Sequence, residues 1–440
     1  MEKRKADSGF SLQPSTFGPG RLMATIRIDK EIQKYNTQRR MVNKEELDRL
    51  LEAMIQSADG ISDLLFVAGR PLQVEIQGEL KPFVSEPPEP VLTSERIEGL
   101  AGAIINNNQR LLQDLKERGS CDCGYTLRSI CRFRVNIYHQ NGNYAMVLRH
   151  LKPLIPSFES LHLAPVFYEI IREKTGLIFV TGGTGMGKTT SIAAMLNEIN
   201  KTRDIHILTL EDPIEFLFTP VKATFSQREL GLDFRDFRDG MRAAMRQAPK
   251  VIFIGEIRDR ETMEIVLNAG ETGHLVFSTL HTASAAGTIN RILGLFSKDE
   301  ENIVRERLAS SMRFIISQRL IPSNSGGRLL VTELMGSSLR TREAILLGEN
   351  EGRILDDIIE AGTVSGWHTF EQSLIKAYEQ DLITEETAML YCANKTKMIQ
   401  RIDMLSLHKP RKGTHSDSLF AGLRMREEEK AARNRSKFRP

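Results

Sequence analysis

The stretch LIFVTGGTGMGKTT occupies residues 177–190 and decides the fold of this chain. Its first five residues are largely apolar and favour a buried strand, and the residues after Lys188 favour a helix. Between them, Gly182 to Thr189 complete the pattern G-x-x-x-x-G-K-T. In this motif backbone N–H groups point at phosphate, the lysine neutralises the β- and γ-phosphates, and the threonine binds magnesium. We therefore predict a site for ATP and Mg²⁺, with Thr189 as a metal ligand.

The predicted cofactor-binding residues are Gly182, Gly183, Thr184, Gly185, Met186, Gly187, Lys188, Thr189 and Thr190. A second apolar strand, Val251–Ile254, leads into Gly255 and Glu256. A carboxylate at the end of a strand beside a P-loop can hold the magnesium shell or orient the attacking water. Glu256 is therefore a predicted catalytic and metal-binding residue.

Two further segments carry candidate catalytic side chains. Glu211, Asp212 and Glu215 follow a predicted strand at 205–210, and ligands of open α/β sheets bind at the carboxyl ends of strands. One of these acids could activate water, or the loop could be a polar cap. His274 and His281 flank the predicted strand Leu275–Leu280. They are either structural histidines or groups that respond to the γ-phosphate.

The sequence pattern divides the chain into six segments. Helical and strand patterns alternate irregularly up to residue 150, which predicts an α+β domain that includes a helix capped by Asn43 and one long helix over 93–115. Strands and helices then alternate regularly, which predicts a parallel sheet. The predicted segments are a flexible basic extension at 1–40, the α+β domain at 41–150, a linker at 151–161, the ATPase domain at 162–340, a helical region at 341–405 and a flexible basic tail at 406–440.

Composition excludes several classes of protein. Hydrophobic residues make up 40% of the 440 residues and charged residues 27%, which is typical of a folded globular protein. No apolar run approaches the roughly 18 residues of a membrane-spanning helix, and the start of the chain lacks the apolar segment of a secretory signal. We therefore expect a cytoplasmic protein with reduced thiols at Cys121, Cys123, Cys131 and Cys392. No second Cys or His pair follows Cys121 and Cys123 to complete a zinc site.

The two ends of the chain carry its basic excess. The net charge is +3, from 60 Lys and Arg against 57 Asp and Glu. Residues 1–40 contribute nine basic and four acidic side chains (+5), residues 408–440 contribute ten and four (+6), and the remainder 41 and 49 (−8). Such ends either bind an anionic partner or simply keep the protein in solution.

Four motifs together resemble one known family. They are GGTGMGKT at 182–189, LEDPIEF at 210–216, VIFIGEIRD at 251–259 and ETGHLVFSTLHTASA at 271–285. In this order and spacing they are similar to the secretion ATPases of bacterial type II secretion systems and type IV pili, most closely to the PilT-like pilus retraction ATPases. The resemblance covers about residues 43–395.

This resemblance implies a fold, an assembly and a function. It implies a homohexamer whose subunits combine a PAS-like N-terminal α+β domain, a RecA-like P-loop ATPase domain and a C-terminal helical region, with ATP bound between the first two domains. Hydrolysis would power pilus retraction and twitching motility. The expected partner is a platform protein of the inner membrane, where the motor would sit peripherally. No DNA or RNA partner is expected.

The resemblance also implies residue roles. Glu215 would be the catalytic base, with Glu211 and Asp212 in support. Glu256 would complete the magnesium and water network. His274 and His281 would sense the nucleotide state. Arginines that contact nucleotide from a neighbouring domain or subunit would come from Arg132, Arg134, Arg242, Arg246 and Arg258.

Departures from the family pattern bear on the direction of work. The chain lacks the paired C-x-x-C element of assembly and type II ATPases, which favours the retraction branch. However, residues 342–348 read REAILLG, without the arginines usual in retraction enzymes, and Leu65 stands where a histidine is common. Alternatives are therefore a pilus assembly or type II secretion ATPase, a RecA-like nucleic-acid translocase and a small-molecule kinase.

Overall fold

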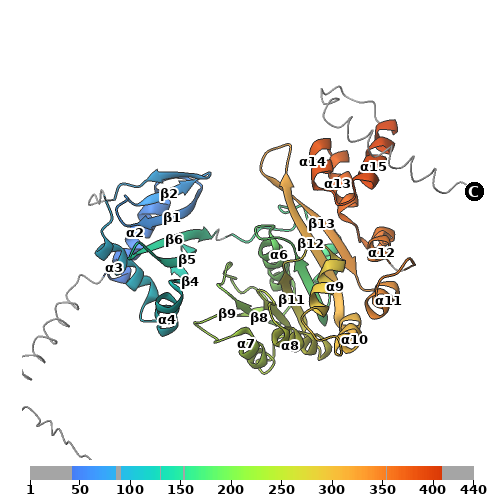
Figure 1. Cartoon of the computed structure of the whole chain (residues 1–440), viewed down its shortest axis with the longest axis horizontal. Coiled ribbons are helices and arrows are strands. Elements are labelled where there is room, and N and C mark those ends of the chain that lie inside the picture. Colours follow the sequence, from blue (N-terminus) through green and yellow to red (C-terminus); the bar gives the residue numbers. More distant parts are fainter. Residues whose placement is uncertain (1–41, 86–90, 129, 152–153, 353, 409–440) are drawn as a thin grey trace, which may run out of the picture. The chain divides into compact units, whose positions relative to one another are not determined.

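The computed structural model describes residues 42–85, 91–128, 130–151, 154–352 and 354–408 (Figure 1). The predicted extension at 1–40 and the tail beyond residue 408 lie outside the described residues. The chain separates after His150 into two compact units, Met1–His150 and Leu151–Pro440. Each unit has its own hydrophobic core and is described by itself.

The first described element of the first unit is helix α2 (Lys44–Gln56), which confirms the helix predicted after Asn43. The Asn43 side chain accepts a hydrogen bond of 2.8 Å from the backbone N–H of Glu46 and so satisfies a free donor of the first turn. Leu47, Leu51 and Met54 lie on one face and are fully buried in the core of this unit. The amphipathic pattern read from the sequence thus faces the core.

The single helix predicted over 93–115 is wrong. The structure has two helices, α3 (Ser94–Ile105) and α4 (Gln109–Arg118). Asn106 and Asn107 adopt left-handed backbone angles, with φ of 46° and 61°, which end the first helix. Asparagine tolerates this conformation better than most residues, and Asn108 then caps α4. Apolar spacing alone did not reveal the break because it continues through both helices.

A six-stranded sheet forms the rest of the first unit, in the order β3-β2-β1-β6-β5-β4. Its strands are β1 (Ile61–Val67), β2 (Gln73–Ile76), β3 (Glu79–Pro82), β4 (Ser120–Leu127), β5 (Cys131–Gln140) and β6 (Asn143–Leu151). β1 pairs antiparallel with β2 and β6, and β4 pairs antiparallel with β5. Helices α2 and α4 pack against β4, so the expected α+β arrangement is present.

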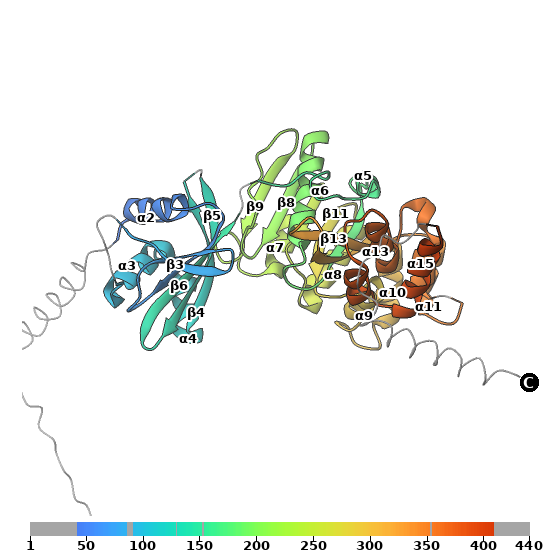
Figure 2. The same cartoon turned by 90° about the horizontal axis from the view of Figure 1, so that it is seen from above.

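The second unit is built on a seven-stranded sheet in the order β13-β12-β7-β11-β10-β8-β9 (Figure 2). Its strands are β7 (Gly176–Thr181), β8 (His206–Glu211), β9 (Thr224–Glu229), β10 (Val251–Ile254), β11 (Leu275–Leu280), β12 (Met312–Pro322) and β13 (Arg328–Gly336). Every neighbouring pair is parallel except β12 with β13. The predicted parallel sheet is therefore confirmed, but β9, β12 and β13 had no counterpart in the prediction.

Every residue of β7 and β11, at the centre of this sheet, is buried. This is the pattern of parallel strands whose two faces are both covered by helices. Both α6 and α8 contact these two strands, and α9 contacts β12 and β13. The helices of this part are α5 (Val166–Ile170), α6 (Lys188–Thr202), α7 (Phe237–Ala244), α8 (Arg260–Glu271), α9 (Ala285–Leu293) and α10 (Glu301–Ser311).

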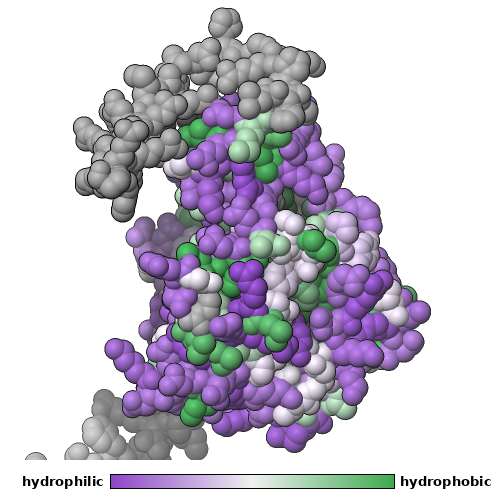
Figure 3. Space-filling model, turned by 90° about the vertical axis from the view of Figure 1, so that its right-hand side faces the viewer, coloured by the Kyte–Doolittle hydropathy of each residue, from purple (hydrophilic) through white to green (hydrophobic). Residues whose placement is uncertain are grey.

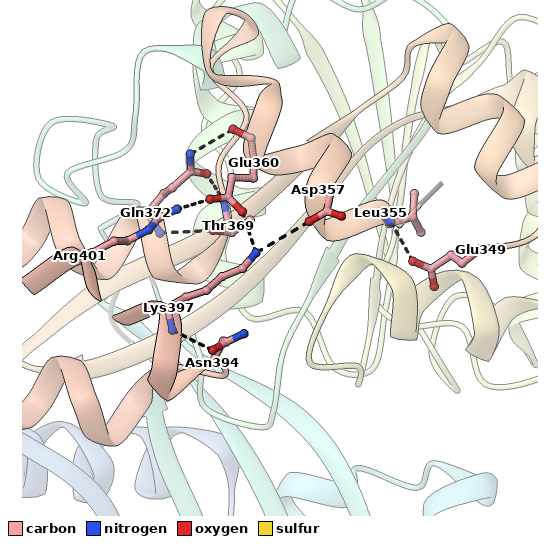
Figure 4. Close-up of polar contacts among 9 residues, drawn as sticks. All are labelled: Glu349, Leu355, Asp357, Glu360, Thr369, Gln372, Asn394, Lys397 and Arg401. Atoms are coloured by element: carbon pink, nitrogen blue, oxygen red, sulfur yellow. Dashed lines mark hydrogen bonds and ion pairs between the residues drawn. The ribbon is translucent and has the colours of Figure 1, made fainter. Parts of the chain in front are cut away.

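Helices follow the sheet, as the sequence predicted. They are α11 (Leu339–Leu347), α12 (Leu355–Ala361), α13 (Phe370–Glu379), α14 (Glu385–Tyr391) and α15 (Lys395–His408). Figure 4 shows how Glu360 of α12 joins them: its carboxylate accepts a 2.9 Å hydrogen bond from Lys397 and also pairs with Arg401. The hydrogen bond from Lys397 lowers the pKa of Glu360. This ionic cluster fixes α15 to α12.

The surface of the C-terminal helices is mostly hydrophilic, with small separate apolar patches (Figure 3). The exposed apolar side chains of this region include Leu339, Leu346, Leu347, Ile354 and Val364. Isolated apolar side chains are normal on protein surfaces. Across the described ranges, no helix has the length and apolar character needed to cross a membrane.

Two helical glycines offer a matched test of the packing. A methyl group at Gly270 of α8 would lie 2.6 Å from Leu177 Cδ2 of β7, whereas at Gly102 of α3 it would meet nothing within 4 Å. We expect Gly270→Ala to destabilise the protein by about 1–3 kcal/mol through overpacking. Gly102→Ala should be neutral or stabilising by up to about 1 kcal/mol, because alanine favours helix. Calorimetric unfolding of both variants measures this, and equal effects would contradict the close contact of α8 with β7.

Candidate active site

The P-loop connects the end of β7 to the start of α6, as predicted. Gly185 and Gly187 have positive φ angles of 76° and 80°, which side chains rarely adopt. Gly182 is restricted by space as well, because a Cβ there would lie 2.7 Å from the carbonyl oxygen of Gln318. The turn itself therefore requires glycine at positions 182, 185 and 187.

Lys188 lies inside this turn. Its ammonium donates hydrogen bonds of 2.9 Å to the carbonyl oxygens of Gly182 and Gly183. Burial lowers its pKa, while the charges of Glu256 and then Glu215 act in the opposite direction. The lysine is therefore a buried cation that bonds two loop carbonyls and interacts electrostatically with two carboxylates, which is an arrangement suited to binding phosphate oxygens.

Strand β12 contacts the P-loop and the helix that follows it. The backbone N–H of Leu320 donates a 3.3 Å hydrogen bond to the sulfur of Met186, and the amide of Gln318 donates a 2.8 Å bond to the hydroxyl of Ser191 on α6. The P-loop and the first turn of α6 thus both contact a strand that the sequence pattern did not reveal.

Glu256 follows β10 and carries a side chain that is 21% exposed. Arg258 hydrogen-bonds one of its carboxylate oxygens, and this contact raises the pKa of Arg258. The Nε2 atom of His281 lies 3.9 Å from the other oxygen. Burial lowers the pKa of His281, and the positive charge of Lys188 lowers it further. The structure therefore brings Lys188, Glu256, Arg258 and His281 together.

Glu211 and Glu215 have different environments. Glu211 is fully buried, and its carboxylate accepts hydrogen bonds from the Thr209 hydroxyl (2.7 Å) and the Glu215 backbone N–H (3.4 Å). Burial raises the pKa of Glu211 to about 7. Glu215 is only partly buried, and its charge acts on Lys188. Glu211 thus holds the loop, whereas Glu215 is the partly exposed acid whose charge acts on the P-loop lysine.

Strand β9 fixes the same loop from its other side. The backbone N–H of Ile214 donates a 3.1 Å hydrogen bond to Glu229, and the Gln227 side chain bonds both the Phe216 carbonyl (2.7 Å) and the Phe218 N–H (2.9 Å). Gln227 and Glu229 were not among the residues predicted for the site. No motif marks them, because they contribute only through a strand that pairs with β8 in the folded chain.

His274 does not join this site within the chain. It precedes β11, whereas His281 follows it, and six strand residues span roughly 20 Å. The His274 ring lies 3.2 Å from the Ala269 carbonyl oxygen, and its backbone carbonyl accepts a bond from Gly176 at the start of β7. The structure therefore places it at the opposite edge of the sheet from the P-loop.

The remaining predicted arginines are at the surface or on the other unit. Arg132 and Arg134 lie on one face of β5, opposite the buried Phe133, and Arg132 hydrogen-bonds the Thr126 hydroxyl at 2.6 Å. They belong to the first unit, whereas the P-loop belongs to the second. The side chains of Arg242 and Arg246, on and just after α7, are exposed.

The residues around the P-loop fit a magnesium ion bound together with nucleotide. Thr189 offers a hydroxyl beside Lys188 in the first turn of α6, and Glu256 offers a carboxylate near the same lysine. Such oxygen ligands, completed by phosphate and water, are those that Mg²⁺ prefers. Within the described ranges, no group of three or more His, Cys, Asp and Glu side chains is arranged to hold a metal. The four cysteines are free thiols.

The sequence pattern of one family, described as type II/IV secretion system protein, matches residues 131–400. The chain belongs to this family. The type IV pilus ATPase PilU of Pseudomonas aeruginosa is 35% identical over 381 residues, or 86% of this chain and 96% of that protein. The type IV pilus retraction ATPase PilT of the same bacterium is 37% identical over 329 residues, or 75% and 93%.

A solved structure of the pilus retraction motor PilT with bound ADP is also similar. Its TM-score is 0.72 at 40% identity, and the match covers 80% of this chain and 98% of that one. The second unit therefore has the RecA-like fold of secretion ATPases, and the chain is a P-loop ATPase. The fold and the enzyme class expected from the four motifs are confirmed.

The variant Glu211→Gln tests the buried carboxylate. Ionising Glu211 is harder in the folded protein than in the unfolded chain, so the wild type loses stability as the pH rises from 4.5 through 7. A pKa shift of this size corresponds to about 3 kcal/mol, and glutamine carries no such cost. We expect the wild type to lose up to that amount relative to the variant between about pH 5 and pH 8. Unfolding midpoints at both pH values measure it, and a pH-independent difference would contradict the prediction.

Proposed function

We propose that this chain is a motor that hydrolyses ATP to power retraction of a type IV pilus. The observation that carries the proposal is the buried Lys188 in a P-loop, under the electrostatic influence of Glu215 and Glu256, in a chain that matches pilus ATPases over almost their whole length. The missing C-x-x-C pairs support retraction over assembly. A pilus assembly or type II secretion ATPase is the alternative within the family.

The hydrolytic step assigns a role to each side chain near the lysine. Lys188 and the P-loop N–H groups bind the β- and γ-phosphates, and Thr189 and Glu256 hold Mg²⁺, which neutralises charge on these phosphates when bound. Glu215 accepts a proton from the attacking water. The water oxygen then bonds to the γ-phosphorus, and the bond from that phosphorus to the bridging oxygen of ADP breaks.

His281 is suited to respond to this step. Its ring lies beside Glu256, and burial lowers its pKa, which favours the neutral imidazole, whose two nitrogens are one donor and one acceptor. We propose that it detects the γ-phosphate or the water network around it. The placement of His274 gives no comparable support for the same role.

The proposed assembly is a homohexamer that works with a platform protein of the inner membrane and does not act on DNA or RNA. The named pilus motors among its relatives support this choice. The basic segment 408–440 would add attraction to anionic lipid, with each accessible basic residue contributing up to about 1 kcal/mol. The motor would therefore be cytoplasmic and peripheral at that membrane.

Three active-site variants test the hydrolytic roles. Lys188→Ala should lose hydrolysis and bind ATP weakly. Glu215→Gln and Glu256→Gln change charge but little volume, so both should keep ATP binding and lose turnover by about 10²–10⁴-fold. Glu198→Gln is a matched control, because Glu198 pairs with Lys201 on the surface of α6. Fluorescent nucleotide binding and phosphate release measure the two properties separately. Normal turnover in either glutamine variant would show that the residue has no catalytic role and only caps its loop.

A deletion strain tests the direction of work. If the chain retracts pili, cells without it should carry more surface pili and lose twitching motility, and the wild-type gene should restore both. The Lys188→Ala gene should restore neither. Electron microscopy and a surface-motility assay measure these traits. Cells without pili would instead assign the chain to assembly, and normal pili with a secretion defect would assign it to type II secretion.

A further inference from the structure

Glu333 is a buried acid with no assigned role. It lies on the edge strand β13, is only 5% exposed, and accepts a 2.7 Å hydrogen bond from the backbone N–H of Ala285. The same carboxylate oxygen lies 3.3 Å from the hydroxyl of Ser317 on β12. Burying a carboxylate is costly, and an apolar side chain of similar size is often as stable in such a place. Packing alone therefore does not explain why a carboxylate occupies this buried position.

One side of Glu333 leads to the P-loop. The Ser317 hydroxyl that donates to Glu333 accepts a 3.2 Å hydrogen bond from the hydroxyl of Thr181. Thr181 is the last residue of β7, directly before Gly182. Two hydroxyl groups thus connect the buried carboxylate to the residue from which the nucleotide-binding turn begins.

The other side of Glu333 leads to the His281 loop. Ala285 is the first residue of α9, and its N–H is one of the free donors that every helix start leaves. Ser284 caps the same helix end, so the carboxylate and the cap together fix where α9 begins. Only residues 282–284 separate this point from His281, whose ring lies 3.9 Å from Glu256.

We propose that Glu333 is a positioning residue for ATP hydrolysis, which holds the His281 loop at a fixed place relative to the P-loop. It does not touch the nucleotide. It acts by bonding the start of α9 and, through Ser317, the end of β7, so that the imidazole stays beside Glu256. The inference rests on the role proposed above for His281 and on the ATPase activity, but not on the direction in which the pilus moves.

The electrostatic environment of Glu333 predicts a second measurable effect, which is the dependence of ATP hydrolysis on pH. Burial raises its pKa to about 7; Asp356 of α12 raises it as well, whereas Arg319 of β12 and the bonds from Ala285 and Ser317 lower it. Protonation of the Glu333 carboxylate places a hydrogen on one of its oxygens and removes the negative charge that attracts the N-terminus of α9. Hydrolysis that depends on the ionised form should therefore rise as the pH passes through about 7.

The experiment compares Glu333→Gln with Glu371→Gln. Glu371 is a matched control, because it is also a buried carboxylate and accepts bonds of 2.9 and 2.8 Å from the N–H groups of Ala393 and Asn394, but it lies in the C-terminal helices. We expect Glu333→Gln to lower kcat about 10–100-fold with little change in KM, and to lose the rise of kcat near pH 7. Glu371→Gln should keep both. Wild-type kcat and an unchanged pH profile in Glu333→Gln would overturn the proposal.

A double-mutant cycle with His281→Ala identifies the route. If Glu333 acts through His281, then Glu333→Gln should have little further effect on kcat once the imidazole is gone. Additive losses would overturn the proposal, and so would a His281→Ala variant with normal turnover. Ser317→Ala, which leaves the carboxylate in place, should lower kcat in the same direction. Should Glu333→Gln unfold, Ser317→Ala and its cycle with His281→Ala decide the question by the same criteria.

Discussion

The buried ammonium of Lys188 is the interaction around which the ATPase unit is organised. Two loop carbonyls bind it, and the charges of Glu256 and Glu215 offset part of the cost of its burial. These groups come from β7, β10 and β8, which run in parallel. Because parallel strands bring their carboxyl ends to one edge of a sheet, residues that are far apart in sequence meet at the lysine.

Four carboxylates near this edge divide into two pairs. Glu215 and Glu256 stay partly exposed, and their charges act on Lys188. Glu211 and Glu333 are buried, have their pKa values raised to about 7, and bond the backbone of neighbouring loops. Burial thus separates the acids that can meet water and nucleotide from those that hold the loops in place. The same residue type serves both purposes because its environment sets its charge.

Strand β12 links the nucleotide site to the C-terminal helices. The N–H of Leu320 bonds Met186 in the P-loop, and the next residue, Ile321, lies in the apolar core that these helices form with β12 and β13. Because backbone N–H groups lie in the plane of a sheet while side chains stand above and below it, one strand contacts both neighbours at once. Figure 4 shows the ionic contacts that hold α15 to α12 within that helical region.

Local sequence determined the P-loop, the strand before it and the helix after it, because the glycines, the lysine and the apolar run act over a few residues. It also predicted Glu215, Glu256 and His281, which lie in the loops that follow β8, β10 and β11. The local pattern wrongly predicted one helix where the structure has α3 and α4, because apolar spacing cannot show the left-handed backbone at Asn106. Only the tertiary structure left Glu215 partly exposed while burying Glu211, and brought Gln227, Ser317 and Glu333 close to the loops of the site. Those outcomes depend on strand order and on burial, which arise from contacts between segments far apart in the chain and leave no periodic trace in the sequence.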